Sequence, residues 1–125
     1  AELGGKENIA QIIAALNQQR MKLGYSAIDI REQWFFPSVG EYSSLLESEG
    51  FEVRQTSYFH RDTPLVEEGI INWVKMFATR WLDDVDTEHQ NELLETTQES
   101  LRTTLFREGS WYADYKRLRI LAVKV

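Results

Sequence analysis

The amino-acid sequence predicts an α+β fold with about four helices and a two-stranded antiparallel β pair, and it leaves open a third, short strand at the N-terminus. Two kinds of pattern support this fold class. Four stretches repeat apolar residues at helical spacing, and two stretches are rich in β-branched and aromatic residues. A chain of 125 residues is long enough for one buried core, so we expect a single domain over residues 1–125.

The first half of the chain predicts two helices. Ile9, Ile12 and Leu16 repeat at helical spacing in the stretch 6–24, and Gly24 is placed where a helix usually ends. Further on, Ser38 and Glu41 form the S-x-x-E pattern of a capping box. That pattern predicts a short helix over 38–49.

Two more helices are expected in the second half. Ile70, Val74 and Trp81 recur on one helical face, and Pro64 stands where the first residue of that helix is expected, because its missing N–H costs nothing there. Leu94 and Leu101 mark the apolar face of the next helix, whose other face is acidic.

Strands are predicted at 51–59 and 115–124. Residues 51–54 alternate between apolar and polar, which is typical of a half-exposed strand, whereas 118–123 are almost continuously apolar, as in a strand inside a sheet. An interior strand with one neighbour leaves backbone groups unpaired and open to another chain. The chain is therefore expected either to form a homo-oligomer through the edge of its last strand or to be a piece of a larger α/β domain.

Composition argues against several classes of function. The formal net charge of -6 gives the chain no electrostatic reason to bind nucleic acid or an anionic membrane. There is no cysteine, and the two histidines have no metal-binding spacing, so no metal site is expected. No apolar run approaches the ~20 residues that span a bilayer, and we expect a cytoplasmic protein.

Four stretches together resemble a known family. "ELGGKENI", "WFFPSVGEYSSLLESEGFEV", "RDTPLVEEGIINWVKMF" and "WYADYKRLRILAVKV" are similar to the C-terminal half of class I S-adenosylmethionine-dependent methyltransferases, close to the trans-aconitate methyltransferase branch. The resemblance covers essentially the whole chain. It implies that the "GG" stretch closes the fifth strand of a Rossmann-like α/β sheet, that 51–59 is strand six, and that 115–124 is strand seven, antiparallel between them.

By the same resemblance the chain is the C-terminal, substrate-side portion of such an enzyme. Residues 63–106 form a helical insertion that helps to cover the substrate pocket. The parent family uses S-adenosylmethionine, which it holds with a glycine-rich turn after strand one. No G-x-G pattern occurs in these 125 residues. We therefore expect no cofactor-binding residue and no activity for this chain alone, and no catalytic residue emerges.

Six residues are candidates for substrate binding: Trp34, Phe35, Phe36, His60, Arg61 and Trp73. Rigid aromatic side chains offer large contact areas, although core packing is the preferred explanation for at least two of the first three. His60 and Arg61 follow strand six, near the strand end where α/β proteins bind ligands.

The guanidinium of Arg61 suits a carboxylate, while a surface ion pair with Asp62 or Glu67 is the more common outcome. Trp73 belongs to an aromatic stripe that could face a small-molecule pocket, but its helical spacing favours core packing. A second hypothesis is that the fragment is now a freestanding small-molecule-binding or dimerisation module.

Overall fold

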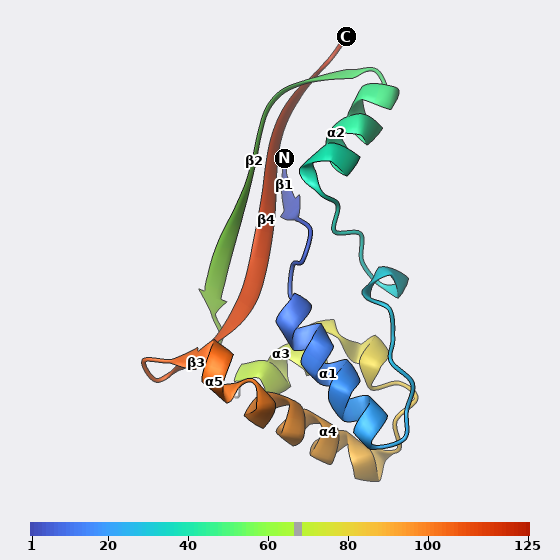
Figure 1. The fold of residues 1–125 in the computed structure, drawn as a ribbon, viewed down its shortest axis with the longest axis vertical. Coiled ribbons are helices and arrows are strands. Elements are labelled where there is room, and N and C mark those ends of the chain that lie inside the picture. The colour runs from blue at the N-terminus through green and yellow to red at the C-terminus, as the bar shows by residue number, and fades with distance from the viewer. Residues whose placement is uncertain (67–68) are drawn as a thin grey trace.

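The computed structural model describes residues 1–66 and 69–125. Figure 1 shows a long β ribbon that projects from a group of helices, with one further helix beside its far end. In chain order the elements are β1 (Glu2–Gly4), α1 (Ala10–Lys22), η1 (Ile30–Glu32), α2 (Val39–Ser48), β2 (Phe51–Pro64), α3 (Gly69–Phe77), η2 (Thr79–Trp81), α4 (Thr87–Ser100), α5 (Arg102–Leu105), β3 (Phe106–Arg107) and β4 (Ser110–Lys124). The predicted α+β class is confirmed.

The strands are arranged in the order β1–β4–β2, and β4 runs antiparallel to both of its neighbours. The third, N-terminal strand therefore exists, and it pairs Leu3 with Leu118. On the other side β2 pairs with β4 from Phe51 to Pro64, with one irregularity between Val53 and Gln55. This is the order that the resemblance implies. The last strand, β4, lies between β1, which ends at the GG stretch, and β2, which precedes the helical insertion.

Both long strands extend beyond their predicted ends, and the helix start expected at Pro64 is wrong. Pro64 is the last residue of β2, where it pairs with Tyr112, and the next residue, Leu65, donates its N–H to the carbonyl of Trp111 at 2.8 Å. Proline is tolerated at a strand end because few ladder hydrogen bonds are lost there. The first described helical residue after it is Gly69.

β3, which forms a tight hairpin with the start of β4, was not predicted from the sequence. Its two turn residues, Glu108 and Gly109, both have left-handed φ values, 51° and 77°. Such turns join antiparallel strands with the right twist, and they normally use glycine or asparagine. Glutamate is uncommon at the first turn position, so the sequence lacks the usual signal of such a hairpin.

The core lies where α1, α3 and α4 pack against the lower part of the ribbon (Figure 1). Ile12, Leu16, Ile70, Val74 and Leu93 are fully buried there. α2 lies apart from this core, beside the other end of the ribbon, and has no fully buried residue. The predicted Ser38–Glu41 capping box at its start is present.

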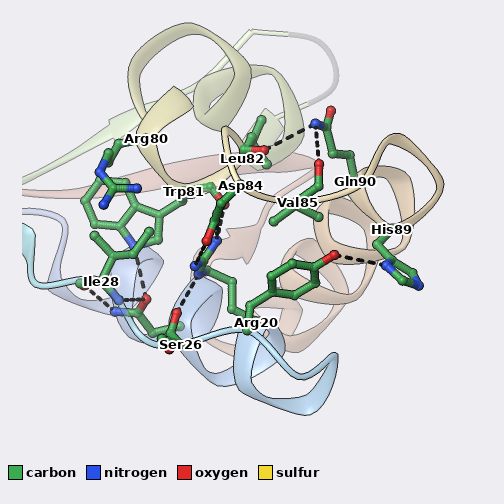
Figure 2. A network of polar contacts seen from close by, with 12 residues as sticks. Arg20, Ser26, Ile28, Arg80, Trp81, Leu82, Asp84, Val85, His89 and Gln90 are labelled. Carbon is green, nitrogen blue, oxygen red and sulfur yellow. Dashed lines mark hydrogen bonds and ion pairs between the residues drawn. The ribbon is translucent and has the colours of Figure 1, made fainter.

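A polar network centred on Arg20 links α1 to the segment around Trp81 and Asp84, as Figure 2 shows. The side chain of Arg20, on α1, is almost fully buried and donates to both carboxylate oxygens of Asp84, at 2.7 and 2.9 Å. It also donates to the backbone carbonyls of Ser26 and Trp81. Because Ser26 and Trp81 lie on different segments, this one side chain ties α1 to the loops on either side of it.

Candidate functional site

A pocket of about 240 Å³ opens beside the carboxyl end of β1. We call it the aromatic pocket, because aromatic rings form most of its wall. It is lined by Gly4, Asn8, Ile9, Trp34, Phe36, Trp73, Phe77, Tyr115 and Arg117. Ligands of α/β proteins collect outside the carboxyl ends of strands, so the position of this pocket suits a binding site.

Four parts of the chain meet at the pocket, and β1 with the loop after it supplies Gly4, Asn8 and Ile9. Trp34 and Phe36 come from the segment that follows η1, and Trp73 and Phe77 come from α3. Tyr115 and Arg117 are two residues apart on β4, so their side chains lie on the same face of the sheet. The insertion between the two long strands thus supplies one wall of the pocket, as the resemblance implies.

The aromatic wall is a continuous set of ring contacts. Trp34 stacks on Phe36 with ring centroids 5.7 Å apart and on Trp81 at 5.6 Å. It also contacts Trp73, at 6.4 Å, and Trp73 packs against Phe77, at 5.6 Å. Offset ring pairs of this kind stabilise a fixed geometry beyond their buried area, so the wall is rigid.

Gly4 allows this wall to reach the sheet. A Cβ at residue 4 would lie 2.7 Å from the ring of Phe36 and 2.9 Å from Nδ2 of Asn8. Both distances are shorter than van der Waals contact. The absence of a side chain on β1 is therefore what lets Phe36 and Asn8 close this side of the pocket.

Three polar side chains line the aromatic pocket, from Asn8, Tyr115 and Arg117. The hydroxyl of Tyr115 accepts a hydrogen bond from the indole N–H of Trp73 at 3.0 Å, which fixes both rings. Arg117, with 26% of its side chain exposed, donates from Nε to Glu2 at 3.4 Å. The pocket therefore combines a planar apolar wall with one cationic group.

Glu2 is shared among three arginines. Besides Arg117 it contacts Arg119 at 2.7 Å and Arg61 at 3.6 Å. The hydrogen bond from Arg119 lowers the pKa of the Glu2 carboxyl from its ordinary value, and the charges of all three arginines lower it further. One carboxylate cannot neutralise three guanidiniums, so this face of the ribbon keeps a positive charge.

The structure brings together three of the six predicted site residues. Trp34, Phe36 and Trp73 line the aromatic pocket, and Trp73 is almost fully buried. Phe35 does not line it and exposes 59% of its surface. Pocket contact and core packing coexist in this region, because one face of Trp34 stacks on the buried ring of Trp81.

His60 and Arg61 do not line the aromatic pocket. Arg61 lies over the ring of Phe59, with its guanidinium carbon 4.9 Å from the ring centroid, and pairs with Glu2. The alternative partner Asp62 pairs instead with Arg107, at 3.0 Å, while Glu67 lies outside the described residues. His60 is exposed and packs edge-on against Tyr58.

A second pocket, of about 420 Å³, adjoins the first between α1 and the segment 28–36. We call it the outer pocket. Asn8, Trp34 and Phe36 line both pockets, so these three side chains form the partition between them. Its charged lining residues are Glu7, Asp29 and Arg31. Asp29 and Arg31 are paired with each other at 2.8 Å, and the hydrogen bond from Arg31 lowers the pKa of Asp29 to about 2.

Three polar residues of the aromatic pocket were not among the six candidates from the sequence. Tyr115 and Arg117 were left out, although the strict alternation along β4 places them on one face. Asn8 gave no signal at all, because its position depends on how the loop after β1 folds against β4. These residues come together only through the pairing of segments that are far apart in the sequence.

Gly4, which ends β1, and Gly5 after it do not form a place for a cofactor. The space above Gly4 is filled by Phe36 and Asn8, and the space above Gly5 by the ring of Tyr58 and the side chain of Leu118, at 3.2 and 3.3 Å. A glycine turn that holds a cofactor keeps this space free for close approach. The residues present therefore do not fit S-adenosylmethionine at this turn.

Over residues 1–66 and 69–125, no three His, Cys, Asp or Glu side chains are grouped as they would be around a metal ion. None of the helices described there is both long and apolar enough to cross a bilayer.

Comparison with known proteins finds a relative over the whole chain. No protein-family model matches. The chain is 29% identical over 133 residues to an uncharacterized methyltransferase of Schizosaccharomyces pombe, and the match covers 99% of this chain. It covers 48% of that protein, so the chain spans about half the length of the curated relative that it matches. The sequence is therefore similar, along its full length, to half of a methyltransferase.

Proposed function

We propose that this chain is the C-terminal, substrate-side portion of a S-adenosylmethionine-dependent methyltransferase of the trans-aconitate methyltransferase-like branch. In this proposal it supplies the wall of the acceptor pocket, while a separate N-terminal half supplies the cofactor. The isolated chain neither binds S-adenosylmethionine nor transfers a methyl group.

The aromatic pocket is the observation that carries this proposal. It lies at the carboxyl end of β1, and it combines residues from the sheet with residues from the helical insertion. Half of a methyltransferase relative lies outside the matched region. A pocket on the strand-end side of a partial sheet is what the substrate side of such an enzyme is expected to provide.

The filled glycine turn supports the inactivity of the chain alone. Neither Gly4 nor Gly5 leaves space for a ligand, and no other pair of glycines is adjacent in the sequence. The cofactor site of the whole enzyme then has to come from residues beyond this chain.

The acceptor is proposed to be a small planar molecule. Trp34, Phe36 and Trp73 offer flat apolar surfaces, and Arg117 offers a charged donor. In the sequence Arg61 was the candidate for a carboxylate, and in the structure Arg117 is the better placed of the two. At about 240 Å³ the pocket is smaller than the ~300–1,000 Å³ that hold drug-sized ligands.

The open edge of β4 is the proposed docking position for a partner strand. Ala1 and Ile120 exchange two backbone hydrogen bonds at 2.9 Å, and Ala122 turns its N–H and C=O to the same side of β4. No described strand pairs with Ala122 on that side. A strand of the cofactor-binding half, or a second copy of this chain, satisfies these groups.

Calorimetric titration of S-adenosylmethionine into the chain tests the central part of this proposal. We expect no binding heat, with an intact methyltransferase under the same conditions as the positive control. Tight, stoichiometric binding to this chain alone would contradict the proposal.

A second candidate function is a freestanding binding or dimerisation module. The specific observation in its favour is that the aromatic pocket is formed by described residues of this one chain. A structure in which the pocket is blocked by the chain's own side chains, together with a monomer at high concentration, would remove the basis for this alternative.

A further inference from the structure

We infer that Asn8 is a ligand-binding residue that donates a hydrogen bond to an oxygen of the small molecule in the aromatic pocket. The inference rests on the proposed function, in which this pocket holds the methyl acceptor. The ligand class is a small planar molecule with a carboxylate or carbonyl oxygen. Asn8 donates to the ligand oxygen, and the positive charge of Arg117 favours a ligand in which that oxygen belongs to a carboxylate.

The orientation of the Asn8 amide is fixed by the protein. Its Oδ1 accepts the backbone N–H of Lys116 at 2.7 Å, and its own backbone N–H donates to the carbonyl of Gly5 at 3.0 Å. Because a backbone N–H can only donate, the oxygen must face β4. The Nδ2 group, with two donor hydrogens, must then face away from that strand.

The Nδ2 group has no acceptor among the described residues. Only 6% of Asn8 is exposed, and its one side-chain hydrogen bond to protein is made by Oδ1. Nδ2 lies beside the ring of Phe36, at the partition between the two pockets. Nδ2 is not one of the fully enclosed unpaired atoms of the described residues, so it keeps contact with the pocket, and a ligand oxygen placed there would accept its free donor hydrogens.

The backbone on both sides of Asn8 is strained. Glu7 and Ile9 have left-handed φ values of 69° and 54°, and a β-branched residue such as Ile9 rarely adopts this conformation. Asp114 stabilises the turn, since its backbone carbonyl accepts from Ile9 at 3.0 Å and its carboxylate accepts from Gln11 at 2.8 Å. Strain of this kind persists where neighbouring structure enforces it, often at ligand sites.

Arg117 completes the recognition of a carboxylate. It lines the same pocket as Asn8, and it shares its carboxylate partner Glu2 with Arg61 and Arg119. A carboxylate between the two residues would receive one hydrogen bond from the amide and one from the guanidinium. A neutral carbonyl would use only the amide, and the aromatic rings would hold the planar body in either case.

Nuclear magnetic resonance of the chain with three probes tests the inference. The probes are benzoate, benzamide and toluene, which share a ring and differ in the oxygen that they present. The measured signal is the side-chain NH₂ pair of Asn8, assigned by its loss in Asn8→Asp. We expect benzoate and benzamide to shift this pair, with benzoate the tighter ligand, and toluene to leave it unshifted.

Two variants separate the roles of the two residues. Asn8→Asp keeps the acceptor for Lys116 but replaces the donor with a negative oxygen, and we expect benzoate to bind about tenfold more weakly or worse. Arg117→Gln is expected to weaken benzoate but not benzamide. Asn91→Asp makes the same chemical change on the exposed face of α4 and is expected to leave binding unchanged. Unchanged amide signals of core residues such as Leu93 confirm that each variant is folded.

Equal benzoate affinity in the wild type and in Asn8→Asp would overturn the inference. An Asn8 signal that does not move at saturating benzoate would overturn it too, as would a folded chain that binds none of the probes. The calorimetric test with S-adenosylmethionine is independent of these outcomes. Benzoate at Asn8 together with tight cofactor binding would preserve this inference while contradicting the proposed function.

Discussion

Arg20 is a buried charged side chain that depends on a half-exposed partner. Its guanidinium is enclosed by α1 and the loops beside it, whereas Asp84 exposes 49% of its side chain. The hydrogen bond from Arg20 lowers the pKa of the Asp84 carboxyl. Because the folded pKa is lowered, the pair stabilises the protein at neutral pH, and that contribution is lost as the pH falls through the folded pKa.

We predict that Asp84→Asn lowers the free energy of unfolding by roughly 1–2 kcal/mol at neutral pH, a value discounted because Asp84 is half exposed. The difference from the wild type should shrink in acid, where Asp84 is protonated in both states. Chemical denaturation over a range of pH measures both effects. Asp83→Asn, next to it and exposed, is the matched control. Equal losses in the two variants would show that the pair contributes nothing specific.

Asp114 shows the opposite shift. Burial raises the pKa of its carboxyl above the ordinary 3.8, although the N–H of Gln11 partly compensates, and its Oδ1 has no partner among the described residues. The folded state therefore binds this proton more tightly than the unfolded state does. The stability that Asp114 contributes is present below the ordinary pKa and is lost as the pH rises through the folded value.

We predict that Asp114→Asn removes this pH dependence while it keeps an oxygen for the N–H of Gln11. Asp114→Ala leaves that N–H without a cap and should lower the free energy of unfolding by about 1 kcal/mol relative to Asn. Denaturation curves in acid and at neutral pH distinguish the three proteins. A wild-type pH dependence that survives in Asp114→Asn would contradict this account of the group.

At the residue scale, the sequence singled out large aromatic side chains as candidates. Trp34, Phe36 and Trp73 were candidates for a pocket because rigid aromatics offer large contact areas, with core packing as the preferred explanation for most of them. Asn8 was not, because one asparagine in a loop is chemically ordinary. Its role arises from the hydrogen bond to Lys116, 108 residues away, which no local pattern contains.

At the element scale, α2 depends on its cap more than the other long helices do. It has no fully buried residue, and its Ser38 side chain accepts from the N–H of Glu41 while the Glu41 carboxylate accepts from the N–H of Ser38. That second hydrogen bond lowers the pKa of Glu41. With little burial to hold it, this helix is expected to open locally before the core unfolds.

We predict that Ser38→Ala lowers the local stability of α2 by about 1 kcal/mol and leaves the core unaffected. Hydrogen exchange should therefore speed up for the amides of 41–48, with no change in α1. Ser44→Ala, on the exposed face of the same helix, is the control. Faster exchange throughout the chain would mean that α2 unfolds only together with the core.

Helix positions followed from apolar spacing, but element ends did not. Pro64 was expected to begin a helix and instead ends β2, because pairing with Tyr112 outweighs its preference for a first helical turn. α1 starts at Ala10 and not earlier, since Ile9 is held in a left-handed conformation against β4. In each case a strand distant in sequence decides the local structure.

At the scale of the whole molecule, the open side of β4 is the main unsatisfied feature. Ala122 lies beside Val53 of β2, but no described strand pairs with it on the β1 side, and unpaired strand edges associate readily. We predict that the isolated chain forms a homodimer through this edge. Ala122→Pro removes the free N–H and should yield a monomer by sedimentation, while Ala122→Ser should not. A wild-type monomer at high concentration would contradict the prediction.

The most direct test of the central claim is the mass of the native polypeptide that carries these residues. The chain has a mass of 14.6 kDa and matches 48% of its methyltransferase relative. Capture with an antibody against a peptide of this sequence, followed by mass spectrometry, should find a protein of roughly twice that mass, whose additional peptides include a glycine-rich turn after a strand. A native polypeptide of 14.6 kDa with no further residues would contradict the claim that this chain is the substrate-side half of a methyltransferase.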